Sequence, residues 1–176
     1  MKVFWGIETS NAQVELSSAA NYLAYISDGK PVTKNNLHVT IKYFGDVNSV
    51  NVISDLEKAM DRICARHKSF YLQVDCAANI PGKNMVCALL DGDIHLLESF
   101  KADVDREVAR LGYKKSKRPS YMPHVTLAYD TRRKWENEDI RLQKIPFLVS
   151  RLTLFESVRQ NGETFFIPLY TSDLRG

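Results

Sequence analysis

The sequence predicts an α+β fold with a mainly antiparallel sheet, and three observations favour it. Segments with strand-like patterns outnumber amphipathic helical segments and do not alternate with them regularly, as they would in a doubly wound parallel fold. The last two strand-like segments are joined by Asn161-Gly162, the strongest short signal for a β-hairpin. A tetrapeptide of the pattern His-Val-Thr-(Ile/Leu) occurs twice, at His38 and at His124, which predicts two related halves facing each other across a cleft.

The first half of the chain is predicted to contain two strands and two helices. We expect strands at residues 2–8 and 37–45, and helices at residues 10–26 and 50–66. The strand segments are rich in β-branched and aromatic residues, and Gly45 closes the second of them. The helical segments repeat apolar residues every three or four positions, and Ser10 is placed to cap the first helix.

The second half is predicted to contain one long helix among several strands. We expect strands at residues 70–77, 85–90, 122–130, 147–159 and 163–171, and a helix at residues 94–111. Residues 79–82 form a turn sequence, Asn-Ile-Pro-Gly, between the first two of these strands. Gly112 follows the helix at the position where a left-handed residue is expected.

Composition is typical of one soluble enzyme domain spanning residues 1–176. The chain is 44% hydrophobic and 26% charged and contains no low-complexity tract, which excludes a disordered or fibrous protein. The apolar run at the N-terminus is too short for a signal peptide, and no segment approaches the ~20 apolar residues of a membrane-spanning helix. We therefore expect a cytoplasmic protein without membrane contact. The net charge of +3 is too small to indicate nucleic-acid binding by itself.

The cysteines predict neither a metal site nor a disulfide framework. Cys64, Cys76 and Cys87 are odd in number, contain no C-x-x-C pair and have no histidine at zinc-finger spacing. We interpret them as reduced, mostly buried residues. No cofactor is predicted from the sequence.

The repeated motif places its polar side chains on one face of each strand. Side chains alternate between the faces of a strand, so the imidazole and hydroxyl of each motif lie together, and a lysine continues the first row. The residues of this polar face are His38, Thr40, Lys42, His124 and Thr126. The apolar residues of each motif face a core, and by the same parity Tyr43 and Tyr129 are expected on the core side.

Two imidazoles flanking one phosphate suit the cleavage of a phosphodiester. One ring can remove a proton from attacking water while the other, protonated, donates to the departing oxygen, and both forms exist near the unperturbed histidine pKa of about 6.5. Thr40 and Thr126 would hold phosphate oxygens, and Lys42 would offset the charge developing there. A single H-x-T is more often a half-buried histidine bonded to a neighbour, but two copies in the two halves favour the catalytic interpretation.

The two motif blocks resemble those of a known family. Residues 36–45, NLHVTIKYFG, and residues 123–128, PHVTLA, are similar to the N-L-H-[LV]-T-L-x-F-L-G and P-H-[LV]-T-L-A blocks of the two-histidine (2H) phosphoesterase superfamily. Within it they resemble the LigT-like RNA 2′,3′-cyclic phosphodiesterases, formerly described as 2′-5′ RNA ligases. The opening strand, the long helix and the closing hairpin also follow the family's order, so the resemblance covers nearly the whole chain.

The resemblance implies both a fold and an activity. The fold would be bilobal with pseudo-twofold symmetry, its antiparallel sheets surrounding a central groove and its helices packed outside. His38 would be the general acid and His124 the general base, with Thr40 and Thr126 binding the phosphate. The expected reaction opens a 2′,3′-cyclic phosphate to a 2′-phosphomonoester without a metal.

Departures from the family pattern leave the substrate open. Tyr129 stands where LigT-like members often carry arginine, and Lys42-Tyr43-Phe44 stands where Arg-Phe-Leu is common. The leading substrates are RNA ends or small nucleotides with a cyclic phosphate; 2′-5′ oligonucleotides or cyclic signalling nucleotides are the alternative. A third possibility is a nucleotide-binding module without turnover, against which both intact histidines count. We expect a monomer with no obligate protein partner.

A basic segment before the second motif allows two interpretations. Lys115, Lys117 and Arg118 could form a rim that attracts the phosphates of longer RNA, or they could belong to a solvated loop. Tyr121 is a candidate for stacking on a base, although such aromatic residues more often form a core or a cleft wall. His67, outside any H-x-T motif, is expected at the surface.

Overall fold

The computed structural model describes residues 1–80, 82–114, 121–135 and 140–176. Its helices are α1 (Gln13–Ile26), α2 (Val50–Arg66) and α3 (Ile94–Arg110), with short 3-10 turns η1 (Ser10–Ala12) and η2 (Lys34–Asn36). Its strands are β1 (Lys2–Glu8), β2 (Lys30–Pro31), β3 (His38–Asp46), β4 (Phe70–Asn79), β5 (Met85–Gly92), β6 (His124–Tyr129), β7 (Ile140–Arg141), β8 (Pro146–Val149), β9 (Arg151–Gln160) and β10 (Glu163–Asp173). The predicted α+β class is confirmed.

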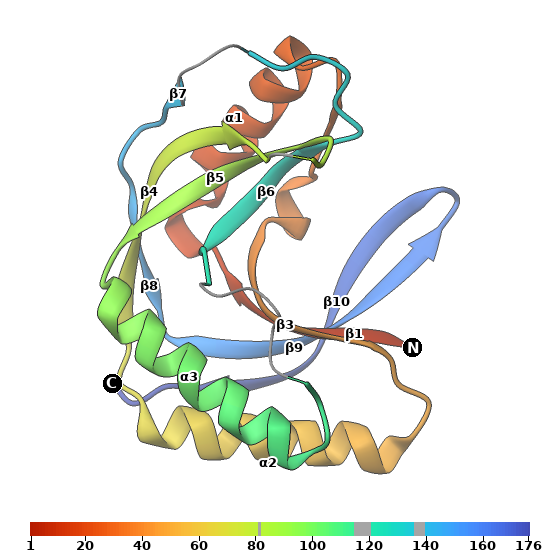
Figure 1. The fold of residues 1–176 in the computed structure, drawn as a ribbon, viewed down its shortest axis with the longest axis vertical. Coiled ribbons are helices and arrows are strands. Elements are labelled where there is room, and N and C mark those ends of the chain that lie inside the picture. The colour runs from red at the N-terminus through yellow and green to blue at the C-terminus, as the bar shows by residue number, and fades with distance from the viewer. Residues whose placement is uncertain (81, 115–120, 136–139) are drawn as a thin grey trace.

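The strands form one curved antiparallel sheet that spans two lobes. Its order is β10-β9-β1-β3-β6-β5-β4-β7, with β2 added to β6 and β8 added to β4. The first lobe contains β10, β9, β1 and β3; the second contains β6, β5 and β4, and the two meet where β3 pairs with β6 (Figure 1). The strands that carry the two motifs are therefore the neighbours at the junction of the lobes.

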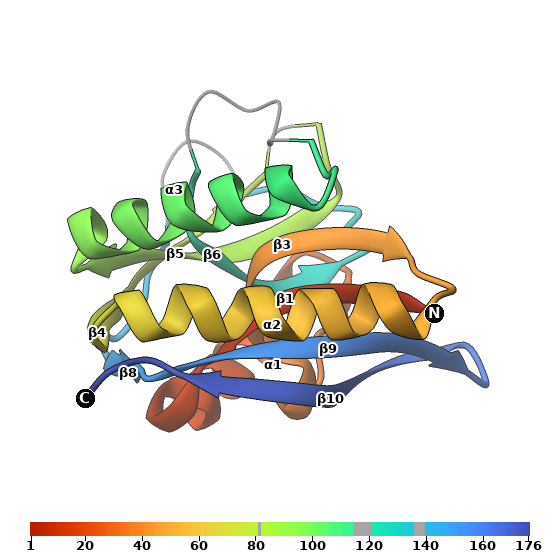
Figure 2. The same ribbon diagram turned by 90° about the horizontal axis from the view of Figure 1, so that it is seen from below.

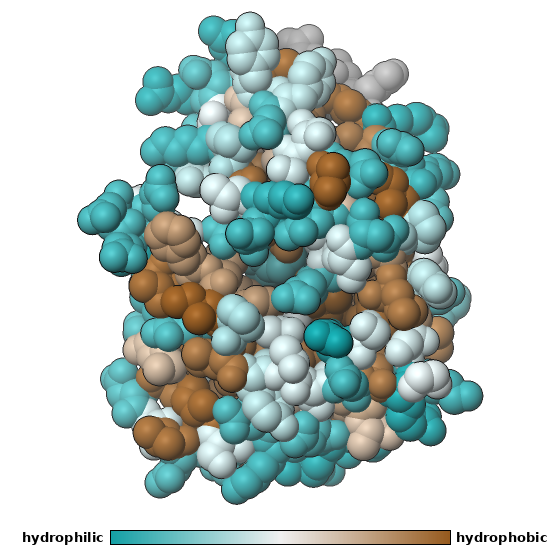
Figure 3. Space-filling model, turned by 180° about the vertical axis from the view of Figure 1, so that it is seen from behind, coloured by the Kyte–Doolittle hydropathy of each residue, from teal (hydrophilic) through white to brown (hydrophobic). Residues whose placement is uncertain are grey.

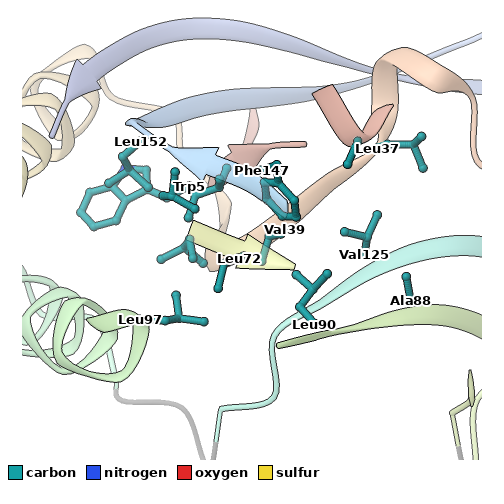
Figure 4. Close-up of a cluster of buried hydrophobic side chains, with 14 of the residues drawn as sticks. Trp5, Leu37, Val39, Leu72, Ala88, Leu90, Leu97, Val125, Phe147 and Leu152 are labelled. Atoms are coloured by element: carbon teal, nitrogen blue, oxygen red, sulfur yellow. The ribbon is translucent and has the colours of Figure 1, made fainter. Parts of the chain in front are cut away.

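The apolar residues of both motifs anchor this junction in the core. Val39 and Val125 are fully buried and face each other across the β3–β6 pair. Figure 4 shows their side chains in one cluster with Phe147 and Leu72, which come from strands of the second lobe. Because the valines occupy the core side, the histidines and threonines of the motifs must occupy the opposite side.

The helices pack on the outside of the sheet. α1 contacts β6 and β5, α2 contacts β9 and β10, and α3 contacts β4, so each lobe has a helical cover. α2 and α3 lie side by side at the end of the molecule remote from α1 (Figures 1 and 2). Seen from behind, the surface is mostly hydrophilic with apolar residues gathered in patches (Figure 3). None of the described helices is long and apolar enough to cross a membrane.

Most predicted elements are confirmed, and two predictions are corrected. Helix α2 occupies the expected residues, Gly112 has a left-handed φ of +87°, and Asn161-Gly162 makes the closing turn. Residues 147–159 are not one strand, because the chain leaves the second lobe as β8, passes Ser150 and enters the first lobe as β9. Ser10 does not cap α1: it lies in the turn η1, and no side chain caps the helix.

Candidate active site

The register of β3 and β6 places both motifs on one face of the sheet. Val39 lies opposite Val125 in an antiparallel pair, so the residues on either side of each valine share the other face. On the two sides of this valine pair, position 38 is across from position 126 and position 40 is across from position 124, so His38 neighbours Thr126 and Thr40 neighbours His124. The four polar side chains that the sequence grouped are thus brought together at the centre of the molecule.

His38 is held by hydrogen bonds on both ring nitrogens. Its Nδ1 lies 2.7 Å from the backbone oxygen of Asn36, which can only accept, so Nδ1 carries the proton. In the neutral ring Nε2 is then an acceptor, and the Thr40 hydroxyl donates to it at 2.9 Å. Burial lowers the pKa of His38, the bond to Asn36 opposes this, and the nearby His124 lowers the pKa further. His38 is therefore neutral at pH 7 in the free protein.

Aromatic rings pack around the His38 ring. The centroid of Phe4 is 4.9 Å from that of His38, and Phe166 meets the ring edge-on at 4.8 Å. Gly6 leaves room for this packing, since a Cβ there would lie 3.2 Å from both Phe4 and Phe155. These rings limit water access to one side of the imidazole and explain its desolvation.

Asn36 connects His38 to the β9–β10 hairpin and was missed as a site residue. Its side-chain amide donates to the oxygen of Thr164 at 2.7 Å and accepts from the backbone N–H of Phe166 at 3.2 Å. Its own carbonyl orients His38. The only signal in the sequence is its position two residues before the histidine, within the block shared with the 2H family.

His124 repeats part of this arrangement. Its Nδ1 lies 2.9 Å from the oxygen of Met122, again two residues earlier, so Nε2 is again the unprotonated nitrogen of the neutral ring. Thr126 lies opposite Cys87, whose thiol donates to the threonine hydroxyl at 3.8 Å. This leaves the hydroxyl proton of Thr126 free to donate to a ligand. Burial raises the pKa of Cys87 to about 11, so the thiol stays protonated.

Lys42 does not lie on the polar face, which corrects the prediction. The β1–β3 register shifts at Ile41, so Thr40 pairs with Gly6 while Lys42 pairs with Trp5. This β-bulge reverses the alternation of side chains beyond Ile41 and turns Lys42 toward α3. Its ammonium donates to the oxygen of Lys114 at 2.7 Å, and burial and the charge of Lys101 lower its pKa.

The same effect moves both motif tyrosines onto the polar face. Beyond Ile41, Tyr43 pairs with Phe4, a neighbour of His38. In β6 the register shifts at Leu127, and Tyr129 follows two residues later. The expectation that these tyrosines belong to the core is therefore wrong: their exposed fractions are 56% and 43%.

A groove of about 620 Å³ runs along the polar face. Its lining contains residues of both motifs, the two tyrosines, the strand β2 and the β9–β10 hairpin: Phe4, Lys30, Pro31, Val32, Thr33, Asn36, His38, Thr40, Tyr43, Thr126, Tyr129, Ser157, Glu163, Thr164, Phe165 and Phe166. His124 is not part of this lining; it lies two residues from Thr126 on the same face of β6. Hydroxyl donors and a neutral imidazole at the groove suit the binding of a phosphate.

Tyr121 contacts the backbone of the first motif and lies outside the groove lining. Its hydroxyl donates to the backbone oxygen of Thr40 at 2.8 Å, and the Lys101 ammonium lies 5.5 Å from its ring centre. It is half-buried, packs against the core and does not line the groove. This placement favours a structural link over base stacking. The predicted RNA-contacting residues Lys115, Lys117 and Arg118 lie outside the described residues.

Comparisons with known proteins agree with this arrangement. The model of the 2′-5′ RNA ligase superfamily matches residues 14–161. A curated relative, RNA 2′,3′-cyclic phosphodiesterase of Methanocaldococcus jannaschii, is 30% identical over 102 residues, which cover 56% of this chain and 53% of the relative. The match thus spans about half the length of that relative.

Solved structures match the fold over nearly the whole chain. TT0787 of Thermus thermophilus has a TM-score of 0.84 at 17% identity, covering 100% of this chain and 99% of that chain. LigT of E. coli, complexed with 3′-AMP, has a TM-score of 0.82 at 24% identity, covering 98% of this chain and 97% of that chain. The bilobal architecture is therefore shared despite low sequence identity.

Proposed function

Because the chain belongs to the 2′-5′ RNA ligase superfamily, we propose that it is a phosphodiesterase that opens 2′,3′-cyclic phosphate ends of RNA or nucleotides to 2′-phosphomonoesters. The observation that carries the proposal is the pairing of Val39 with Val125, which sets both H-x-T groups on one face. The name of the Methanocaldococcus jannaschii relative, RNA 2′,3′-cyclic phosphodiesterase, supports this substrate. The reaction needs no metal in this scheme.

The proposed step is a hydrolysis by paired imidazoles. A water oxygen attacks the phosphorus while Nε2 of His124 takes one of its protons. The bond from phosphorus to O3′ breaks, and Nε2 of His38 gives its proton to the departing oxygen. The product carries a 2′-phosphomonoester and a free 3′-hydroxyl. His124 then releases its extra proton to solvent, and His38 takes up a proton from solvent before the next turnover.

His38 has to gain a proton before it can act as the acid. Its pKa is lowered in the free protein by burial in particular, so this proton arrives with the substrate. The negative charge of the bound phosphate favours the imidazolium, which offsets the effect of burial. Once Nε2 is protonated it no longer accepts from Thr40, and that hydroxyl turns to a phosphate oxygen.

A panel of substrates tests the proposal. Wild type, His38→Ala and His124→Ala are assayed in the presence of chelator on 2′,3′-cyclic nucleotides, 2′-5′ and 3′-5′ dinucleotides and cyclic dinucleotides. We expect turnover of a 2′,3′-cyclic phosphate and a loss of on the order of 10²–10⁴-fold in either variant. His95→Ala removes a fully exposed histidine and is the matched control. A requirement for added metal, or full activity in both histidine variants, contradicts the scheme.

A second candidate keeps the same chemistry on 2′-5′-linked nucleotides. The observation that favours it is the aromatic lining contributed by Tyr43, Tyr129 and Phe165, since a linear diester carries a nucleoside on each side of its phosphate. Release of one nucleoside from a 2′-5′ dinucleotide, faster than opening of a cyclic phosphate, would favour this candidate.

A further inference from the structure

Two tyrosines at matching positions of the two motifs face the groove. Tyr43 is five residues after His38, Tyr129 is five residues after His124, and a register shift follows the threonine of each motif. Both side chains are about half exposed. Within the described residues neither hydroxyl has a hydrogen-bond partner, so the rings are not fixed there by polar contacts.

The tyrosines lie on opposite sides of the paired motifs. β3 and β6 run antiparallel about Val39 and Val125, so the chain leaves this pair in opposite directions toward the two tyrosines. Tyr43 belongs to the first lobe, and Tyr129 belongs to the second. Both line the same groove, which therefore has one exposed phenol ring on each side of the proposed phosphate position.

The rest of the groove offers few charges to a ligand. Among the lining residues that the structure describes, only Lys30 and Glu163 are charged, and the Lys30 ammonium lies 3.7 Å from a carboxylate oxygen of Asp130. The other walls include Pro31 and Phe165. A groove of this composition recognises flat apolar groups better than additional phosphates.

We propose that Tyr43 and Tyr129 each stack on one nucleobase, so that the preferred substrate contains at least two nucleosides next to the reacting phosphate. This inference rests on the proposed phosphate position between the motifs. The volume of about 620 Å³ lies within the range of on the order of 300–1,000 Å³ that ligand pockets occupy. Stacking on a tyrosine needs no particular base, so the two subsites select for the number of nucleosides rather than for sequence.

Calorimetric titration tests the two subsites without depending on turnover. The protein is a His38→Ala, His124→Ala double variant, with or without Tyr43→Ala or Tyr129→Ala. The ligands are adenosine 2′,3′-cyclic phosphate, diadenosine ending in a 2′,3′-cyclic phosphate, and 2′-5′-linked diadenosine. The two dinucleotides separate an RNA end from a 2′-5′ linkage as the natural source of the second base.

Each tyrosine substitution should weaken dinucleotide binding by on the order of 5- to 100-fold, the usual effect of losing one stacked base. A mononucleotide fills one subsite, so only one of the two substitutions should weaken it. Tyr→Phe at either position keeps the ring and should bind as the parent does. Tyr25→Ala removes an 83% exposed tyrosine of α1 and serves as the matched control.

Equal affinity for the mononucleotide and both dinucleotides, with tyrosine variants that behave like Tyr25→Ala, would overturn the inference. If the proposed enzymatic function were wrong, the experiments would give a different result from the one that overturns the stacking inference. In that case wild type would turn over none of the ligands while the tyrosine-dependent preference for dinucleotides persisted.

Discussion

At the scale of single residues, the two histidines are similar in their hydrogen bonds and different in their surroundings. In each, the Nδ1–H group donates a hydrogen bond to the backbone carbonyl two residues earlier, that of Asn36 or Met122. In the part of the chain that the structure describes, only His38 is enclosed by aromatic rings and bonded at Nε2 to a threonine. The motif predicted the similarity, but the difference arises from Phe4 and Phe166, which lie far from His38 in the sequence.

The lowered pKa of His38 gives a test of which histidine is the acid. In His124→Gln only His38 can transfer protons, so the residual kcat/KM depends on pH through that single group. If His38 is the acid, activity should fall as pH rises through a midpoint below 6.5, because the imidazolium is lost. If it is the base, activity should rise through the same midpoint.

The measurement is the pH profile of the variant between pH 4.5 and 8, with the His38 titration followed by NMR in the same protein. His95→Gln is the control for loss of a remote imidazole. A residual activity that does not change across this range would mean that His38 transfers no proton in the rate-determining step.

At the scale of elements, β-bulges decide which side chains reach the groove. Strict alternation predicted the faces of His38 and Thr40 correctly and failed beyond Ile41, where the register with β1 shifts. A bulge depends on how a strand meets its neighbour, and that pairing is not visible in the sequence of one strand. For this reason the prediction for Lys42 was wrong and the groove-facing Tyr129 was missed.

Helix α2 was easier to predict, because its pattern is local. Apolar residues repeat on one face of the helix, and the structure buries Leu56, Ala59, Met60, Ile63 and Cys64 on that face. The division between β8 and β9 was not visible, because only Ser150 separates the two strands and the difference lies in their partners.

Tyr121 links the segment before β6 to β3, and removal of its hydroxyl tests this link. In Tyr121→Phe the backbone oxygen of Thr40 loses its donor, and the carbonyl of Met122 that orients His124 is less firmly placed. We expect the free energy of unfolding to fall by about 1 kcal/mol. We expect kcat to decrease several-fold with little change in KM, because the phosphate ligands remain.

Steady-state kinetics and urea unfolding of the same preparation measure both effects. Tyr113→Phe is the matched control, since Tyr113 packs against the ring of Phe44 and its hydroxyl has no partner among the described residues. An increase in KM with kcat unchanged would instead indicate that Tyr121 contacts substrate, as the sequence suggested.

At the scale of the whole molecule, the contacts between the lobes include two that differ in how far the sequence predicts them. One is the β3–β6 pair that carries the motifs, and the other is the contact between α2 of the first lobe and α3 of the second. The sequence predicted the first through its repeated motif, and the family match confirms the resemblance on which the bilobal fold was inferred. The second joins residues that lie 37 to 45 positions apart in the chain, and no local pattern indicates it.

Buried carboxylates of α3 hold arginines of α2 in this second contact. Glu107, 1% exposed, accepts hydrogen bonds from Arg62 and Arg66. Asp103, 5% exposed, accepts from Arg66 and lies 2.9 Å from Nε2 of His67. His67 is thus a half-buried member of an ionic cluster, which corrects its assignment to the surface. The cluster joins α2 to α3, and none of its residues lines the groove.

Neutralising Glu107 should weaken the contact between α2 and α3, and the size of this effect should depend on pH. Burial alone would raise the pKa of Glu107, but the bonds from Arg66 and Arg62 outweigh it and lower the pKa below its ordinary value of 4.5. A carboxylate whose pKa is lower in the folded state stabilises the fold above its unfolded pKa, and this stabilisation disappears as pH falls through the folded pKa. Glu107→Gln should therefore reduce the free energy of unfolding by about 2 kcal/mol at pH 7, and the difference from wild type should shrink below pH 4.5.

Urea unfolding at pH 7, 5 and 3.5 measures this difference between Glu107→Gln and wild type, with Glu98→Gln as a control on an exposed carboxylate of the same helix. Because Glu107 does not line the groove, its loss should change stability more than kcat; a stability difference that stays constant down to pH 3.5 would show that the charge of Glu107 is not what joins the lobes.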